Sequence, residues 1–152
     1  MCDSDYAVRF AETIHAVDWD IELPRVWKDY FAEKGELPCY AEDARSNQRL
    51  RVRTHGIMWF ESGLQFQPRT VHPIGIYTKD FSRQGIGVLS ALQLYPEETL
   101  RIALPTFWLQ VRVSRVRRIT SKCYEVGTTV THRHDPSLAA FELSADEHRT
   151  TA

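Results

Sequence analysis

The chain has 152 residues, of which 43 % are hydrophobic, and this is enough to form the core of one domain. No apolar run reaches the length of a membrane span, which excludes the class of helical membrane proteins. The acidic start, MCDSDYAVRF, lacks the basic and then apolar pattern of a secretory signal. We therefore expect a cytoplasmic protein whose three cysteines, Cys2, Cys39 and Cys123, are reduced.

The net charge of −1 conceals three segments of unequal charge. Residues 1–44 carry a net −7, residues 45–119 a net +8 and residues 120–152 a net −2. Eleven of the twelve cations in the middle segment are arginines, which pair with phosphate and stack on planar rings. The middle segment therefore favours an anionic partner. Neutralisation by the acidic segments within the fold would explain the charge equally well.

The first 40 residues are predicted to be helical. A first helix would place apolar residues at spacings of four, four and three on one face. They are Tyr6, Phe10, Ile14 and Val17. A second helix is predicted from about Pro24 to Lys34, because proline suits the first turn and Gly35 suits the position after the end. Residues 1–43 are thus predicted to form an N-terminal helical extension.

From about residue 50 the apolar period changes to two. Six segments rich in β-branched and aromatic residues follow, separated by turn sequences such as KDFSRQG and LYPEE. They span residues 50–60, 71–80, 85–90, 99–105, 107–119 and 123–132. Because no helical pattern interrupts them, they predict an antiparallel barrel or sandwich over residues 44–134. Residues 135–152 are predicted to give a short C-terminal helix, capped by Asp135 with Pro136 at its first position, and a frayed tail.

Two polar motifs stand beside the first predicted strands. Arg45-Ser-Asn-Gln-Arg49 precedes the first strand, and Asp80-Phe-Ser82-Arg-Gln-Gly85 joins the second strand to the third. By itself, the first motif is typical of a solvated hinge, and the second is typical of a hairpin turn in which Gly85 takes a positive φ. As parts of one site, they would present arginines, a carboxylate, a hydroxyl and a backbone position without a side chain to the same ligand.

The order of the two motifs resembles the PilZ domain family: R-x-x-x-R, an interval of 30 residues and then D-x-S-x-x-G, on a β-rich background. The resemblance spans about residues 44–132 and includes the strand sequences LRIALP, FWLQVRVSRVRR and CYEVGTTVTH. It implies a six-stranded antiparallel β-barrel that binds the bacterial second messenger cyclic di-GMP. It also implies the ligand-binding residues, which are Arg45, Arg49, Asp80, Ser82 and Gly85.

The chemistry of these residue types agrees with that ligand, which carries two phosphates and two guanines. Arginine pairs with phosphate oxygens, takes O6 and N7 of guanine bidentately and stacks on purines. Asp80 would accept from the N1–H and N2 amino donors of guanine, and Ser82 could donate to phosphate. A shifted alignment would make Arg49 and Arg53 the pair. We prefer Arg45 and Arg49, because residues 51 and 53 fall inside a predicted strand and share one barrel face.

We expect a sensor that changes conformation on binding cyclic di-GMP and signals to a protein partner, without a cofactor. An enzyme is not expected, because no set of base, nucleophile and orienting group is recognisable. One alternative is a PilZ-like adaptor that contacts proteins and binds no nucleotide. Another is a barrel that binds single-stranded nucleic acid through the same arginines and through exposed aromatics. Those aromatics would be Trp59, Phe60 or Trp108, which the strand pattern places in the core.

Two further groups are not assigned to a site. His132 and His134 could share a metal with Asp135, but a metal centre needs three or four ligands, so we expect partly exposed histidines. The second basic run is Arg115, Arg117 and Arg118. These arginines could flank the ligand, but a run of this kind is more often a solvated strand face, and this is what we expect.

Overall fold

The computed structural model describes residues 3–27, 30–32, 35–36, 50–51, 53–62 and 69–142. The helical elements in this part of the chain are helix α1 (Asp3–Ala16) and two short 3-10 helices, η1 (Tyr30–Ala32) and η2 (Leu138–Phe141). The strands are β1 (Gly35–Glu36), β2 (Leu50–Arg51), β3 (His55–Ser62), β4 (Ile74–Phe81), β5 (Gly85–Ser90), β6 (Thr99–Ala103), β7 (Trp108–Thr120) and β8 (Cys123–His134).

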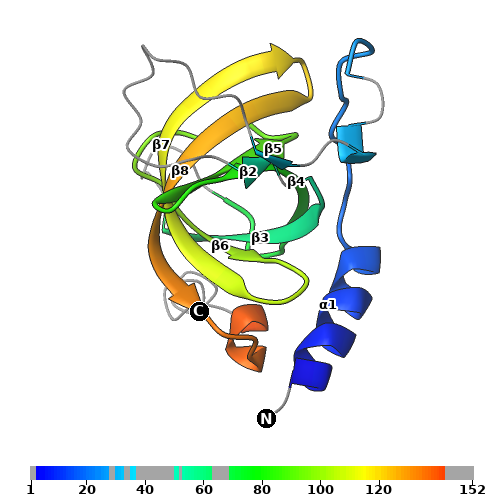
Figure 1. Ribbon diagram of the computed structural model, residues 1–152, viewed down its shortest axis with the longest axis vertical. Coiled ribbons are helices and arrows are strands. Elements are labelled where there is room, and N and C mark those ends of the chain that lie inside the picture. The colour runs from blue at the N-terminus through cyan, green and yellow to red at the C-terminus, as the bar shows by residue number, and fades with distance from the viewer. Residues whose placement is uncertain are drawn as a thin grey trace.

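Six strands close into an antiparallel barrel (Figure 1). They pair in the order β4-β3-β6-β7-β8-β5, and β5 pairs back onto β4. The two-residue strands β1 and β2 extend the sheet beside β4, where Leu50 pairs with Phe81 and Arg51 with Asp80. The expectation of a six-stranded antiparallel barrel is confirmed.

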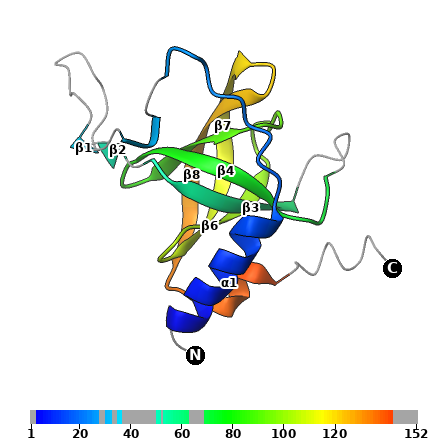
Figure 2. The ribbon, with the colours of Figure 1, turned by 90° about the vertical axis from the view of Figure 1, so that its right-hand side faces the viewer.

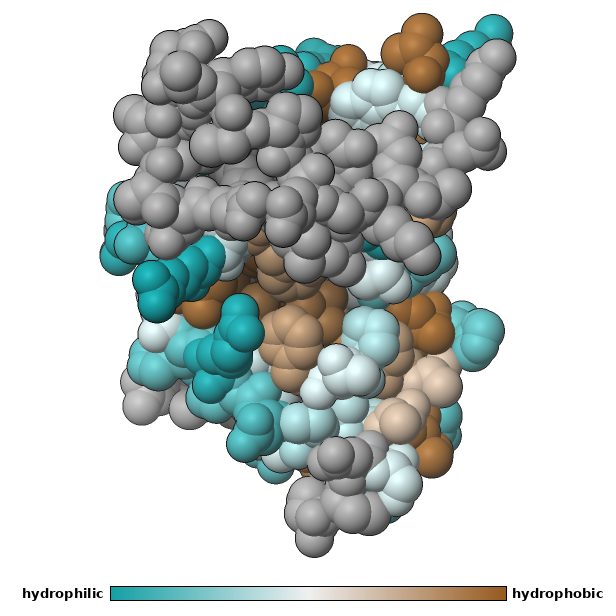
Figure 3. Space-filling view, in the orientation of Figure 1, coloured by the Kyte–Doolittle hydropathy of each residue, from teal (hydrophilic) through white to brown (hydrophobic). Residues whose placement is uncertain are grey.

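The barrel interior is filled by apolar side chains from all six strands. Buried members include Met58, Ile76, Val88, Ile102, Val111 and Val126. Because side chains alternate across a strand, the residues between them face outward. Trp59, Phe60 and Trp108 are exposed to only 2 %, 4 % and 7 %, so the prediction that they belong to the core is confirmed. Hydrophobic residues also reach the outer surface beside hydrophilic ones (Figure 3), as is usual for a folded protein.

Helix α1 packs against the outside of β3 and beside η2 (Figure 2). The predicted helix face is confirmed: Tyr6 is buried, and Phe10, Ile14 and Val17 pack in the same cluster. The Tyr6 hydroxyl lies 2.5 Å from the carbonyl oxygen of Leu104 and 2.8 Å from that of Phe107, in the connection between β6 and β7. The helix is therefore fixed to the barrel by both apolar contact and hydrogen bonding.

The second predicted helix, from Pro24 to Lys34, is wrong for the part of it that the structure describes. Residues 17–27 run along the barrel without helical structure, and η1 is only three residues long. The reason is that aromatic side chains of this segment contact the barrel, and these contacts hold the segment in a non-helical conformation. The Tyr30 hydroxyl, for example, donates to the carbonyl of Thr78 on β4 at 2.6 Å. We call residues 17–27 and 30–32 the strap.

The C-terminal helix is a four-residue 3-10 helix, η2, and its predicted cap is wrong. The residue before it is Ser137, which makes no side-chain capping bond, and Asp135 lies further upstream. The segment is held by packing, because Ala140 is buried and Phe141 lies 5.3 Å from the Tyr6 ring, measured between ring centroids. Tertiary contact therefore decides where this element forms.

The first predicted strand is divided in two. Residues 50–60 were expected to form one strand, but β2 ends at Arg51 and β3 begins at His55. Arg53 lies between them with its guanidinium 4.2 Å from the centre of the Tyr30 ring, an attractive cation–π contact. The premise that residues 51 and 53 lie within one strand is therefore wrong.

Cys123 is a free, fully buried cysteine at the start of β8. Burial, and secondarily the charge of Glu125, raises its pKa to about 11. At about pH 8.5, where an ordinary thiol is half ionised, we expect iodoacetamide to leave Cys123 unmodified in the folded protein. Peptide mass spectrometry should find it modified only after denaturation. Equal modification in the folded and denatured protein would contradict this burial.

Among the described residues, no helix combines the length and the apolar character needed to cross a membrane.

Candidate functional site

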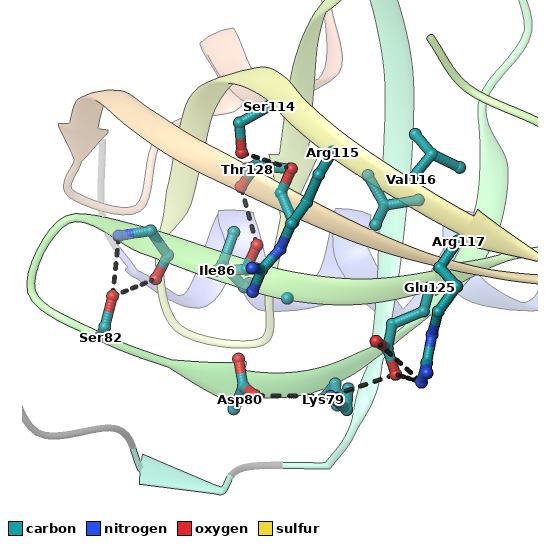
Figure 4. Close-up of a pocket in the computed structure, with 14 residues that line it drawn as sticks. Lys79, Asp80, Ser82, Ile86, Ser114, Arg115, Val116, Arg117, Glu125 and Thr128 are labelled. Atoms are coloured by element: carbon teal, nitrogen blue, oxygen red, sulfur yellow. Dashed lines mark hydrogen bonds and ion pairs between the residues drawn. The ribbon is translucent and has the colours of Figure 1, made fainter. Parts of the chain in front are cut away.

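A pocket of about 650 Å³ opens where β4, β5, β8 and β7 lie side by side (Figure 4). Its lining includes Asp80, Ser82 and Gly85, so the barrel brings together all three residues predicted from the second motif. Arg45 and Arg49 lie outside the described residues. The two residues that follow them in the sequence, at positions 50 and 51, pair with the β4 strand that ends at Phe81.

The connection between β4 and β5 is a tight hairpin turn. The Ser82 N–H donates to the carbonyl of Gly85 at 2.9 Å, and the Gly85 N–H donates to Ser82 Oγ at 3.2 Å. The interpretation of this motif as a hairpin turn is thus confirmed. The Ser82 hydroxyl also donates to the Gly85 carbonyl in a long contact of 3.5 Å, so its second acceptor position is left for a ligand in the pocket.

Gly85 is needed for close packing and not for an unusual backbone conformation. The expected positive φ is wrong, since Gly85 does not occupy the left-handed region. A β carbon at this position would collide with the carbonyl oxygen of Thr128 on β8. Gly85 therefore lets the turn approach the neighbouring strand, and this approach shapes one end of the pocket.

A row of four residues crosses the pocket from β4 to β7. Asp80 pairs with Gly87, Gly87 with Gly127, and Gly127 with Arg115. A β carbon on Gly87 would lie 2.7 Å from Asp80 Oδ1, and one on Gly127 would lie 2.8 Å from Arg115 Nε. The carboxylate and the guanidinium thus occupy the space above two residues without side chains. We call Gly87 and Gly127 the glycine floor.

The β-bulge in β4 determines where the Asp80 carboxylate lies. The pairing of β4 with β5 shifts by one residue between Thr78 and Asp80, and such bulges re-aim side chains next to functional sites. The Tyr30 hydroxyl bonds the carbonyl of Thr78 at the start of this bulge. The strap therefore supports the strand segment that carries the carboxylate.

Three cations line the pocket from the barrel, and two of them share one carboxylate. Lys79 Nζ lies 3.1 Å from Glu125 Oε2, and Arg117 Nη2 lies 3.3 Å from Glu125 Oε1. Burial raises the pKa of Glu125, but these cations lower it by more, so its net pKa falls below the ordinary value. Glu125 therefore stays ionised at neutral pH and compensates both charges. Lys79 also lies 3.8 Å from Asp80.

Only part of the second basic run, residues 115, 117 and 118, lies at the pocket. Arg115 and Arg117 line it, whereas Arg118 is absent from its lining and donates to the carbonyl of Thr120. All three side chains are exposed, as expected for a solvated face. The position of Arg115 and Arg117 in the pocket lining is compatible with the alternative that they flank a ligand. The glycine floor was not predicted, although a lone glycine within a strand is a signal of close approach by another group.

The histidines at the end of β8 lie away from this pocket. The His134 ring stacks on Trp108 with 3.8 Å between centroids, and its Nε2 lies 2.8 Å from Gln110 Oε1. Burial, followed by the charge of His132, lowers the pKa of His134. Within the described ranges, no group of three or more potential ligand side chains could hold a metal ion.

The pocket can accept a ligand that has both hydrogen-bond donors and acceptors or anionic groups. Asp80 offers carboxylate oxygens as acceptors, and the nearby cations offer donors. No family model, curated protein or solved structure matches the chain.

Proposed function

We propose that this protein is a PilZ-like sensor that binds cyclic di-GMP in the pocket between β4 and β7. The main support is that the three residues of the second sequence motif line one pocket together with several cations. These residues are Asp80, Ser82 and Gly85. In the proposed complex these three residues act with Arg45 and Arg49, and the protein performs no catalysis.

The guanine edge is the part of the ligand that Asp80 would recognise. Guanine presents two adjacent donors, N1–H and the N2 amino group, and an ionised carboxylate offers two acceptor oxygens in matching positions. Asp80 is only 5 % exposed, so its oxygens are held in place before the ligand arrives. Preorganisation of this kind supports recognition, because less conformational freedom is lost on binding.

The phosphates of the ligand would be bound by arginines. Arg45 and Arg49 precede β2 directly in the sequence, and β2 pairs with the strand end that carries Asp80. Charge-assisted hydrogen bonds of arginine to phosphate are about twice as strong as neutral ones. The proposed site thus combines a fixed carboxylate for the base with arginines for the phosphates.

The strap is the proposed route from ligand binding to a protein partner. Tyr30 bonds the carbonyl of Thr78, two residues before Asp80. A displacement of β4 by the ligand would therefore change the contacts of the strap, whose outer surface includes exposed Val26 and Phe31. In the proposed signalling step, a partner protein senses that change.

Binding of single-stranded nucleic acid is less well supported. That function would use exposed aromatic side chains as stacking platforms. The three aromatic candidates, at positions 59, 60 and 108, are buried in the barrel or beneath its helical elements.

Calorimetric titration with cyclic di-GMP tests the proposal. The unmodified protein is expected to bind saturably, and the double variant Arg45→Ala, Arg49→Ala should bind about 100-fold more weakly or not at all, because two charge-assisted contacts are lost. A matched control is Arg112→Ala, Arg118→Ala, which removes two exposed arginines outside the pocket lining and should retain affinity.

Two results would overturn this assignment. If the unmodified protein gives no binding, the nucleotide-free adaptor becomes the better description. If both double variants bind equally well, a ligand site exists but the arginines of the first motif do not form it.

A further inference from the structure

We infer that Arg115 is a further ligand-contacting residue, and that with Asp80 it reads a guanine base over the glycine floor. The inference rests on the proposed function and deepens it, because it assigns the residue that would distinguish guanine from adenine. It arises from the placement of one side chain on β7, which carries no part of either sequence motif.

The Arg115 side chain lies across the neighbouring strand and toward Asp80. Its Cγ and Nε would be 2.9 Å and 2.8 Å from a β carbon on Gly127, so the chain runs flat over that glycine. Figure 4 shows it crossing from β7 over β8 toward β5, where the Asp80 carboxylate faces it from β4. The register places two strands, about 4.8 Å apart, between the backbones of these residues.

Arg115 also differs from the other barrel cations of the pocket in its charge compensation. Lys79 and Arg117 both contact Glu125. Within the part of the chain that the structure describes, the Arg115 side chain has neither an ion pair nor a hydrogen bond. Its five N–H donors are therefore available to a ligand without first breaking an internal contact.

The two side chains together match one continuous edge of guanine. Going around that edge, the N2 amino group and N1–H are donors, and O6 and N7 are acceptors. A carboxylate complements the two donors, and an arginine fork takes O6 and N7 bidentately. Adenine presents an acceptor at N1 and a donor at N6, so it would oppose like groups at both positions. Asp80 and Arg115 thus predict selection of guanine.

The glycine floor gives this pair room to act. A β carbon on Gly87 would press on Asp80, and one on Gly127 would press on Arg115. Both positions lie on the outer face, because their neighbours Ile86, Val88 and Val126 point into the core. The two glycines therefore let the Asp80 and Arg115 side chains lie close to the sheet, so that the edge of one base could meet both charged groups.

The test measures how a change in the protein alters the effect on affinity of a change in the ligand. The affinities of the unmodified protein, Arg115→Ala, Arg115→Lys and Arg118→Ala are measured for cyclic di-GMP and for its 7-deaza analogue, which lacks N7. We expect Arg115→Ala to weaken cyclic di-GMP binding about 10- to 100-fold. Arg115→Lys should recover little, because lysine lacks the planar fork. Arg118→Ala, the same change outside the pocket, should stay within about twofold.

The analogue separates base reading from simple charge attraction. In the unmodified protein, loss of N7 should cost about tenfold in affinity, whereas in Arg115→Ala it should cost almost nothing. An equal cost in both proteins would overturn the base contact and leave Arg115 as a contact to phosphate at most.

Failure of the inference and failure of the proposed function give different results. If the unmodified protein binds cyclic di-GMP and Arg115→Ala binds it as tightly as Arg118→Ala does, the role of Arg115 is overturned and the proposed function stands. If the unmodified protein binds neither ligand, both are overturned.

Discussion

Replacement of Asp80 by alanine is expected to weaken cyclic di-GMP binding about 100-fold, which corresponds to about 2.7 kcal/mol. The variant leaves the N1–H and N2 donors of a bound guanine without their acceptor in a site where Asp80 is 5 % exposed. Water replaces the carboxylate poorly there, so the cost includes desolvation of the ligand's unpaired donors. The measurement is isothermal titration calorimetry with the purified protein.

Two variants serve as controls for this prediction. Asp135→Ala makes the same change in charge at an exposed residue outside the pocket and should bind normally. Asp80→Asn keeps the shape of the side chain and one carbonyl acceptor, so its affinity for cyclic di-GMP should lie between those of Asp80→Ala and Asp135→Ala. Thermal unfolding of each variant shows whether the fold is retained. A folded Asp80→Ala protein with unchanged affinity would remove Asp80 from the site.

The substitution Glu98→Gln is expected to lower the free energy of unfolding by about 3 kcal/mol or more, the range for breaking a buried ion pair. Glu98 is fully buried and accepts two hydrogen bonds from Arg69. Nε donates to Oε2 at 2.9 Å, and Nη2 donates to Oε1 at 2.7 Å. It also accepts from the backbone N–H of Tyr95 at 2.8 Å. The amide leaves Arg69 partly unpaired, and Arg69 also lies over the Phe60 ring, with 4.8 Å from its guanidinium carbon to the ring centre.

The neighbouring residue provides a control for this effect. Glu97 contacts Arg112 at 3.8 Å, but the two side chains are exposed to 73 % and 48 %. Exposed pairs contribute little, so Glu97→Gln should change the free energy of unfolding by less than about 1 kcal/mol. Urea denaturation of both variants measures the difference. Similar stabilities would show that the buried pair between the β5–β6 connection and Arg69 is not important for folding.

The strands could be predicted from the sequence because their signal is local. The segment 85–90 coincides with β5, and the segment 107–119 lies within one residue of β7 at each end. Alternation of buried and outward residues is a property of each strand alone. Closure of six strands into a barrel followed only from the resemblance, because it also requires β3 to pair with β6 and β5 to pair with β8, and neither pair consists of strands that follow each other in the sequence.

The strap could not be predicted, because its conformation depends on distant residues. Between Pro24 and Lys34 the apolar spacing fits a helix, yet Tyr30 is fixed by a hydrogen bond to Thr78, 48 positions away. Trp19 likewise stacks on Tyr77 of β4, with 5.7 Å between ring centroids. Packing of this kind overrides helix propensity, which contributes less than about 1 kcal/mol per residue.

The candidate site was predictable only where its residues are consecutive. Asp80, Ser82 and Gly85 belong to the hairpin of β4 and β5 and lie within six residues of sequence, so one sequence motif contains them. Arg115 and the glycine floor meet Asp80 only through the register of four strands. Register depends on the turns and bulges between strands, and a shift of one residue would turn each of these side chains to the opposite face.

The attachment of α1 to β3 and of η2 to β6 has a practical consequence for handling the protein. In the closed order of strands, β3 and β6 lie across the barrel from β5 and β8, which bear the pocket (Figure 1). Helix α1 and η2 are therefore attached on the side of the barrel opposite the candidate site. A fluorescent reporter fused there, or a sensor chip coupled there, would leave the mouth of the pocket facing solution.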